Sequence, residues 1–448
     1  MWRGGLHQLA KQIQKRYAQR NAMFKINTFT KAVVANKTVL VRVDFNVPLK
    51  ETPEGIVVAD DKRLQRALPT LRALIESNAK VILVSHLGRP KSPSDTKYSL
   101  APIAQYLTHT LHLPCLFVPD TVGERATAAV AALQPGQVLL LENVRFYPEE
   151  KKNDAHFAKQ LAGLADIYIN EAFSACHRAH ASVVGVTHFL PSYAGLALTA
   201  EVTALAELLD TPKRPFVVVL GGAKISDKVA ALKNLSGIAD LVLVGGAAAN
   251  NFLKAAGFEI YRSRTEENTQ SDSDEPDYTK VARNIMTEHK TERVLKDGYI
   301  PLPKIIYPID VVAAPSIETT DAAAVTTIDL SHDMQDTEEN VQLAYFDIGP
   351  KTRKLYAALI AEAGTVFWNG PMGVWENDLF AAGTKTVARA IAANSGKTVI
   401  GGGDTLSATH YLHTEHKYSY VSAAGGAALD FLGGAKLPGL QPLLQTEY

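Results

Sequence analysis

The sequence predicts an α/β protein with two Rossmann-like, three-layer domains, each built around a parallel sheet. Three observations favour this fold class. The chain has 448 residues, more than one ordinary domain holds, and 46% of them are hydrophobic, which is enough for sizeable cores. Short apolar runs alternate with segments of helical character, a pattern typical of parallel sheets covered on both faces. Several of these runs end directly in glycine or polar residues, where open parallel sheets bind ligands.

The expected elements follow from this alternation. Strands are predicted in the first half at Thr38–Val43, Lys80–Val84, Val138–Leu141 and Ile167–Ile169. Strands are predicted in the second half at Phe216–Leu220, Leu241–Val244, Ile305–Tyr307, Val366–Trp368, Thr398–Ile400 and Tyr418–Val421. Helices are predicted between them at Arg63–Ser77, Ala155–Leu164, Asp227–Leu235, Ala248–Ala256, Lys351–Glu362 and Gly383–Ala393.

Breaks between the runs predict how the chain is organised. The predicted parts are a basic extension at 1–22, a first domain at 23–196, a connector at 197–214 and a second domain at 215–423. Within the connector, Ala197–Leu209 has helical character, and the two prolines of Thr211–Pro215 end that helix before the next strand. The segment Arg262–Asp277 is polar and acidic, and is expected to be a surface loop or disordered.

Composition excludes several classes of protein. The formal net charge is zero, so neither nucleic acid nor a membrane is expected as a partner, and no apolar run is long enough to span a bilayer. Cys115 and Cys176 lack disulfide-framework or metal-site spacing, which favours a reducing compartment and a cytoplasmic location. Residues 1–22 are basic and leave two alternatives: an organellar transit peptide, or a harmless extension before a start at Met23.

Two glycine-rich turns point to phosphate binding. The run Phe216–Leu220 continues into Gly221-Gly222-Ala223-Lys224-Ile225-Ser226-Asp227-Lys228. A helix opened by two glycines would leave backbone N–H groups free at its positive end, and Lys224 and Lys228 would add charge on one face. Gly401–Thr405 is a second such turn, whose carboxylate and hydroxyl suit a metal-bridged phosphate. A single glycine turn, taken alone, more often has a structural role than a binding role. The chain lacks the Gly-x-Gly-x-x-Gly fingerprint, which counts against a dinucleotide dehydrogenase.

Basic side chains follow successive strands of the first half. A lone arginine is usually a solvated surface residue, and a lone histidine usually has an ordinary loop role. Their placement favours a site, because the carboxyl ends of parallel strands meet at one edge of a sheet. The planar fork of arginine also binds phosphate or carboxylate oxygens in pairs. The candidates are Arg63, His86, Arg89, Arg145 and Arg178.

Eight motifs together resemble one known family. They are Val41–Pro48, Ser85–Pro90, Glu142–Phe146, His177–Ser182, Gly221–Lys228, Asp347–Thr352, Trp368–Glu376 and Gly401–Thr405. In these residues and in this order, the chain resembles phosphoglycerate kinase over about residues 24–440. The resemblance implies a monomer that transfers phosphate between 1,3-bisphosphoglycerate and ADP with Mg²⁺, giving 3-phosphoglycerate and ATP.

The resemblance also assigns the domains. The first domain, with a C-terminal segment at about 424–448 joined to it, would bind glycerate, and the second would bind the nucleotide. Substrates held on separate domains imply a hinged cleft that closes and expels water, with hinge motion near Ala197–Leu209. A cytoplasmic enzyme is expected, or an organellar one if residues 1–22 are a transit peptide.

Individual roles are implied residue by residue. Arg63 would lie against the carboxyl end of the glycerate and the phosphoryl group in flight, and Lys224 would stabilise that group from the nucleotide side. The implied substrate contacts, to the glycerate backbone or its non-transferring phosphate, are Asp44, Asn46, His86, Arg89, Arg145 and Arg178. The implied contacts to the nucleotide, with Glu376 at the ribose and Asp404 at the magnesium ion, are Lys228, Glu376, Gly402, Gly403, Asp404 and Thr405.

The chain departs from the family pattern in several places. A Thr-Gly-Gly-Gly-Ala-Ser turn is usual near the C-terminus, but here Ala423–Ala428 has lost the threonine and one glycine. Gly245–Asn250 has lost a glycine and a methionine, so the adenine pocket is expected to differ. Glu171 stands where aspartate is common, and the acidic insertion after Tyr261 is longer than usual. The altered Ala423–Ala428 turn supports a second hypothesis, a kinase-like protein of weak activity that serves as a binding module. A third hypothesis, a periplasmic solute receptor, is disfavoured because the sequence shows no secretory signal peptide.

Overall fold

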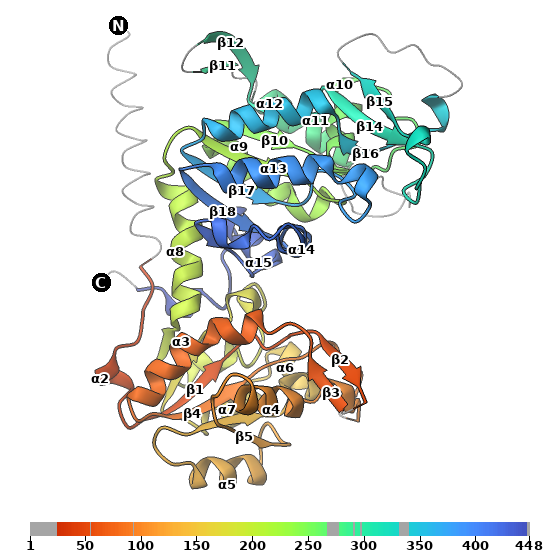
Figure 1. The fold of residues 1–448 in the computed structure, drawn as a ribbon. Coiled ribbons are helices and arrows are strands. Elements are labelled where there is room, and N and C mark those ends of the chain that lie inside the picture. Colours follow the sequence, from red (N-terminus) through yellow and green to blue (C-terminus); the bar gives the residue numbers. More distant parts are fainter. Residues whose placement is uncertain are drawn as a thin grey trace, which may run out of the picture. The chain divides into compact units, whose positions relative to one another are not determined.

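A computed structural model describes residues 25–53, 55–92, 94–266, 277–289, 292–295, 298–330 and 340–445 (Figure 1). The chain divides into two compact units: unit 1 comprises Met1–Thr203 and Lys436–Tyr448, and unit 2 comprises Ala204–Ala435. The predicted extension 1–22 and residues 267–276 of the predicted acidic loop lie outside the described residues. Among the residues that are described, no helix has the length and apolar character needed to cross a bilayer.

Unit 1 is built on a six-stranded sheet in the order β5-β6-β4-β1-β7-β8, in which every neighbouring pair is parallel. Its strands are β1 (Thr38–Arg42), β4 (Lys80–Val84), β5 (Cys115–Val118), β6 (Val138–Leu141), β7 (Ile167–Asn170) and β8 (Ser192–Ala194). Its helices are α2 (Lys31–Val34), α3 (Lys62–Glu76), α4 (Ala101–His109), α5 (Glu124–Ala132), α6 (Pro148–Lys152) and α7 (Ala155–Ala162).

The layers of unit 1 follow from the alternation of side chains along β1. Val39 and Val41 pack on one face in a cluster with α3 and α4, whereas Leu40 packs on the other face with α5 and α7. Helices therefore cover both faces, which explains why the strands are apolar throughout rather than at every second residue. A small hairpin, β2 (Leu49–Thr52) and β3 (Gly55–Val58), projects beyond β1.

Unit 2 repeats this plan with a parallel sheet in the order β13-β10-β9-β17-β18-β19. Its strands are β9 (Phe216–Leu220), β10 (Leu241–Val244), β13 (Ile305–Ile306), β17 (Thr365–Asn369), β18 (Lys397–Gly401) and β19 (Tyr420–Val421). Its helices are α9 (Val229–Ile238), α10 (Ala248–Ala256), α11 (Tyr278–Glu288), α12 (Pro350–Ala361), α13 (Ala382–Ala393), α14 (Gly403–Tyr411) and α15 (Gly426–Leu432). One sheet face packs on α12 and α13 around the buried Trp368 and Tyr356.

Unit 2 also carries antiparallel strands that the sequence did not predict. One sheet has the order β15-β14-β16, with β14 (Asp310–Ala314), β15 (Thr326–Asp329) and β16 (Ala344–Ile348), and a hairpin pairs β11 (Glu292–Leu295) with β12 (Gly298–Pro303). The prediction of parallel sheets in two α/β domains is nevertheless confirmed.

The connector is a single helix, α8 (Leu196–Asp210), which Figure 1 shows as uninterrupted. The boundary between the units falls within it, between Thr203 and Ala204. The C-terminal boundary falls at Ala435, so residues 424–435 lie in unit 2, whereas the sequence placed the segment from about 424 with the first domain.

Candidate active site

Unit 1 gathers its basic side chains beyond the carboxyl ends of β6, β4, β1 and β7, four consecutive strands of the sheet. We call these residues the basic cluster: Arg42, Arg63, His86, Arg89, Arg145, Arg178 and His180. Each of the five basic residues predicted from the sequence belongs to it. The strand order explains why, because residues that follow neighbouring parallel strands meet at the same edge.

Burial, and after it the repulsion between neighbouring charges, lowers the pKa values of three members of the basic cluster. Burial lowers the pKa of His86 well below its usual value, and the charges of Arg42 and Arg145 lower it further. Burial, followed by Arg42 and Arg178, lowers the pKa of Arg145 to about 10. Burial and Arg145 lower the pKa of His180 to about 4. A protein that concentrates so much positive charge has a ready site for an anion.

The loops that carry these side chains are joined by hydrogen bonds. The Asn46 side-chain oxygen accepts from the Gly88 N–H at 2.8 Å, and Arg145 Nη1 donates to the Gly88 carbonyl at 2.6 Å. Arg63 Nη1 pairs with Asp44 Oδ2 at 2.7 Å, and Ser174 Oγ donates to the same oxygen at 2.6 Å. These contacts hold the loops after β1, β4, β6 and β7 in one arrangement.

Sequence reasoning did not assign Arg42 and His180 to the site. Arg42 is 1% exposed, and its Nη2 lies 2.9 Å from His86 Nδ1. A signal was present, because Arg42 is a charged residue at the end of an otherwise apolar buried strand. His180 belongs to the His177–Ser182 motif, but its spacing gave no reason to prefer it to its neighbour His177.

In unit 2, three turns meet beyond β9, β17 and β18, and we call them the turn cluster: Gly221–Lys228, Asn369–Met372 and Gly401–Thr405. The Gly221 N–H donates to the Asn369 carbonyl at 2.9 Å, and the Gly222 N–H donates to the Pro371 carbonyl at 2.7 Å. The N–H groups of the two glycines themselves are therefore not free for an anion, and the free N–H groups predicted at the start of the following helix stay a prediction. A Cβ at Gly221 would lie 2.1 Å from the Pro371 oxygen. Only a residue without a side chain therefore allows the backbones of these two turns to lie so close together.

The helix after these glycines also begins later than predicted. A 3₁₀ turn, η5 (Ser226–Lys228), precedes α9, so Lys224 lies before the helix, where it is exposed. Lys228 Nζ donates to the Lys224 carbonyl at 3.3 Å. Burial lowers the pKa of Lys228, while the carboxylates of Asp227, Asp404 and Glu266 oppose this effect. Asp404 is thus close enough to Lys228 to interact with it electrostatically.

The Gly401–Thr405 turn starts α14. Gly402 has φ 95°, the left-handed region that favours glycine, and Asp404 is exposed in the first helical turn. Thr405 is fully buried, and its Oγ1 accepts from the Gly370 N–H at 2.6 Å. The hydroxyl therefore joins two turns of the cluster, a role that sequence reasoning missed.

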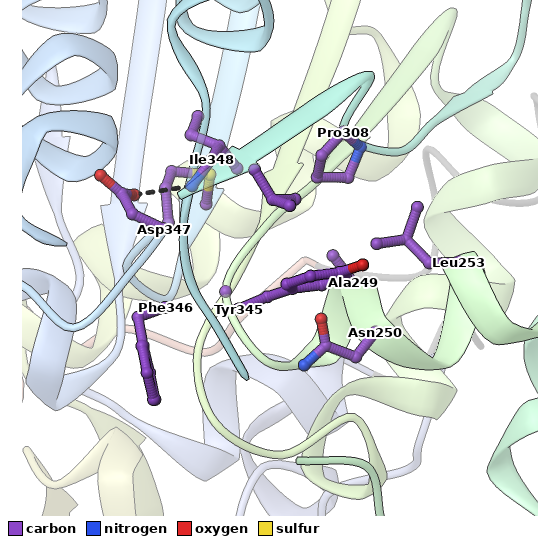
Figure 2. A pocket seen from close by; sticks show the side chains of 11 residues that line it. Ala249, Asn250, Leu253, Pro308, Tyr345, Phe346, Asp347 and Ile348 are labelled. Atoms are coloured by element: carbon purple, nitrogen blue, oxygen red, sulfur yellow. Dashed lines mark hydrogen bonds between the residues drawn. The ribbon is translucent and has the colours of Figure 1, made fainter. Parts of the chain in front are cut away.

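A small pocket lies beside these turns (Figure 2). It is lined by α10, β14, β16 and Met372, and most of its surface is apolar, with Asn250 and Asp347 among its polar residues. Burial raises the pKa of Asp347 to about 7, although its carboxylate accepts from the N–H groups of Gly383 at 2.7 Å and Ile348 at 2.9 Å. Figure 2 shows the bond to Ile348.

Comparison with known proteins decides the family. The model of the family described as phosphoglycerate kinase matches residues 29–435. The chain belongs to the phosphoglycerate kinase family. A phosphoglycerate kinase of Coprothermobacter proteolyticus is 44% identical over 420 residues, covering 94% of this chain and 99% of that protein. That of Pseudothermotoga lettingae is 44% identical, covering 92% of this chain and 96% of that protein.

Solved structures agree with the family assignment. The phosphoglycerate kinase of Coxiella burnetii has a TM-score of 0.75 at 36% identity, covering 92% of this chain and 96% of that one. The phosphoglycerate kinase of Pyrococcus horikoshii has a TM-score of 0.74 at 32% identity, with the same two shares of 92% and 96%.

The altered turn of this phosphoglycerate kinase family member lies at the start of α15. Gly425, with φ 55°, is the residue before the helix, and Gly426 is its first residue. A glycine is therefore kept at the one position of the turn whose backbone is in the left-handed region. Glu376, predicted at the ribose, is exposed on the loop that follows Met372.

The residues present fit a magnesium ion brought by a nucleotide. Within the described parts of the chain, no three or more His, Cys, Asp or Glu side chains are grouped so that they could hold a metal. Asp404 nevertheless offers an exposed carboxylate beside Lys228. Magnesium is commonly bound through one or two carboxylates together with substrate phosphates and water.

Proposed function

We infer that this protein catalyses the phosphoglycerate kinase reaction, the reversible transfer of a phosphoryl group between 1,3-bisphosphoglycerate and ADP, giving 3-phosphoglycerate and ATP. Family membership over residues 29–435 supports the reaction class. The observation that carries the proposal is the basic cluster in unit 1, which gathers five arginines and two histidines at one edge of the sheet, where burial and neighbouring positive charges lower the pKa values of His86, Arg145 and His180. A multiply charged phosphate ester would be stabilised by such a group of arginines.

The basic cluster would bind the glycerate substrate. His86, Arg89, Arg145 and Arg178 would hold the non-transferring phosphate, and Asp44 and Asn46 would contact the glycerate backbone. The lowered pKa values of His86 and His180 keep both rings neutral at pH 7, so they would act as hydrogen-bond donors instead of cations. The permanent charge of the site would come from its arginines.

The turn cluster would bind the nucleotide. Lys228 would contact its phosphates, Glu376 its ribose and Asp404 its magnesium ion, while Gly402, Gly403 and Thr405 would line the phosphate end. When bound, Mg²⁺ would neutralise charge on the transferring phosphates.

The reaction needs positioning more than proton transfer. The attacking atom is an ionised carboxylate oxygen or a phosphate oxygen, so no general base is required. In-line placement and neutralisation of charge on the moving group remain, and Arg63 and Lys224 would supply positive charge from the two sides. Closure about α8, near Ala197–Leu209, would bring the sides together and exclude water. We further propose a cytoplasmic monomer.

A coupled assay tests this function directly. Purified protein with Mg²⁺ should consume ATP only when 3-phosphoglycerate is present, and Lys224→Ala should lower kcat by roughly 10³-fold. Lys233→Ala is the matched control, because Lys233 is an exposed lysine on the following helix, α9. If the wild-type protein consumes no ATP under these conditions, the proposal fails in favour of a kinase-like binding module, for which the altered Ala423–Ala428 turn is the supporting feature.

A further inference from the structure

A buried chain of hydrogen bonds links a carboxylate to two members of the basic cluster, Arg42 and His86. Glu150, on α6, is 0% exposed and accepts from both donors of Ser182: from its backbone N–H at 2.8 Å and from its Oγ at 2.6 Å. Ser182 Oγ accepts in turn from Arg42 Nε at 2.9 Å. Arg42 Nη2 then lies 2.9 Å from His86 Nδ1, and the Arg42, Ser182 and His86 side chains are each less than 9% exposed.

The chemistry of these groups permits one assignment of protons. Ser182 has a single hydroxyl proton, which it gives to Glu150, so its oxygen can only accept from Arg42. A guanidinium group donates and never accepts, so His86 Nδ1 must be the unprotonated acceptor. The ring proton of His86 therefore resides on Nε2, the remaining donor of the ring.

We propose that Glu150 is a positioning residue that acts through Ser182 and Arg42 to hold His86 as the neutral tautomer with its proton on Nε2. Its importance for substrate binding rests on the function proposed above, in which His86 donates to the phosphate of the glycerate. The carboxylate also acts on the site electrostatically, since it is buried and close enough to Arg145 to oppose the lowering of its pKa.

The most selective perturbation is Glu150→Gln, which keeps the shape of the side chain and removes its charge. One of the two carboxylate oxygens that face Ser182 is then replaced by the NH₂ group of the glutamine amide. If that group faces the Ser182 N–H, two donors oppose each other; if it faces Oγ, it displaces the hydroxyl proton towards Arg42 Nε. Either arrangement weakens the hydrogen bond from Arg42 Nε to Ser182 Oγ. The matched control is Glu149→Gln on the same helix, because Glu149 is exposed.

Kinetics and spectroscopy together test the proposal. In Glu150→Gln, KM for 3-phosphoglycerate should rise by about tenfold or more, because hydrogen bonds to charged groups are the strong ones. KM for ATP should stay unchanged, as should both constants in Glu149→Gln. Long-range ¹H–¹⁵N spectra of ¹⁵N-histidine-labelled protein, with His86→Gln to identify the signal, should give the Nε2–H pattern in the wild type and a mixture in Glu150→Gln.

Two results would overturn the proposal: an Nδ1–H or doubly protonated His86 in the wild type at pH 7, or Glu150→Gln kinetics equal to those of Glu149→Gln. If Glu150→Gln does not fold, as judged by circular dichroism, Ser182→Ala breaks the same chain at its next member and should give the same rise in KM. A wild-type protein without 3-phosphoglycerate-dependent activity would instead refute the proposed function, while the tautomer of His86 would still test the network.

Discussion

Replacing Glu171 by glutamine is expected to change how the stability of unit 1 depends on pH. The Glu171 carboxylate is buried at the start of α8, where it accepts from Thr70 Oγ1 at 2.6 Å and from the Ala197 N–H at 3.1 Å. It also packs tightly on Gly195, where a Cβ would lie 1.9 Å from Glu171 Oε2. Burial raises the pKa of this carboxyl to about 7, and the hydrogen bonds only partly oppose the effect.

The magnitude follows from the shift. The folded value of about 7 exceeds the ordinary value of 4.5, so the folded state binds this proton more tightly than the unfolded state, by about 3 kcal/mol. Because the pKa is raised, this stabilisation is fully present below about pH 4.5 and is lost as the pH rises through 7. Glutamine has no such proton. The free energy of unfolding of Glu171→Gln, relative to the wild type, should therefore increase by about 2.5 kcal/mol from pH 5 to pH 8.

Hydrogen exchange of peptides from β7, followed by mass spectrometry in increasing urea, isolates the stability of unit 1 in a chain whose units need not unfold together. The control is Glu76→Gln, because Glu76 is exposed at the end of α3. The free energy of unfolding of this variant, relative to the wild type, should not change over this pH range. Other titrating groups, including His86 and His180, cancel in the comparison. A flat difference for Glu171→Gln would refute the reasoning, because the buried carboxyl would then not titrate in this window.

Three further predictions test the site. Arg63→Ala should lower kcat roughly 10³-fold in the coupled assay with only a small loss of thermal stability, because its ion pair with Asp44 is partly exposed; an unchanged kcat would contradict its role. Asp404→Asn should raise the Mg²⁺ concentration for half-maximal activity by about tenfold at fixed ATP, and an unchanged Mg²⁺ titration would argue against its metal role. Gly221→Ala should destabilise unit 2 by roughly 1–3 kcal/mol in calorimetry, because its Cβ would meet the backbone oxygen of Pro371 at 2.1 Å; an unchanged melting temperature would refute that clash.

Much of the fold was predictable because its elements have local signatures. The structure has Lys80–Val84, Phe216–Leu220 and Ala248–Ala256 at the predicted bounds, since each is an apolar or amphipathic segment bounded by polar residues or glycine. The edge strand Cys115–Val118 was missed because it is short and only partly buried. The antiparallel strand Asp310–Ala314 was also missed, since its pairing with residues 326–329 and 344–348 depends on partners far along the chain.

The sequence by itself determined which chemical groups follow each strand, and hence that two sets of candidate phosphate-binding side chains would gather at two sheet edges. Only the tertiary structure decided how those groups are used. The N–H groups of Gly221 and Gly222 are taken up by the turn after β17, and Arg42 is buried against His86 and Ser182. The physical reason is that a backbone donor bonds to whichever acceptor the sheet order brings beside it. In this sheet β9 and β17 are neighbours although they are far apart in the chain.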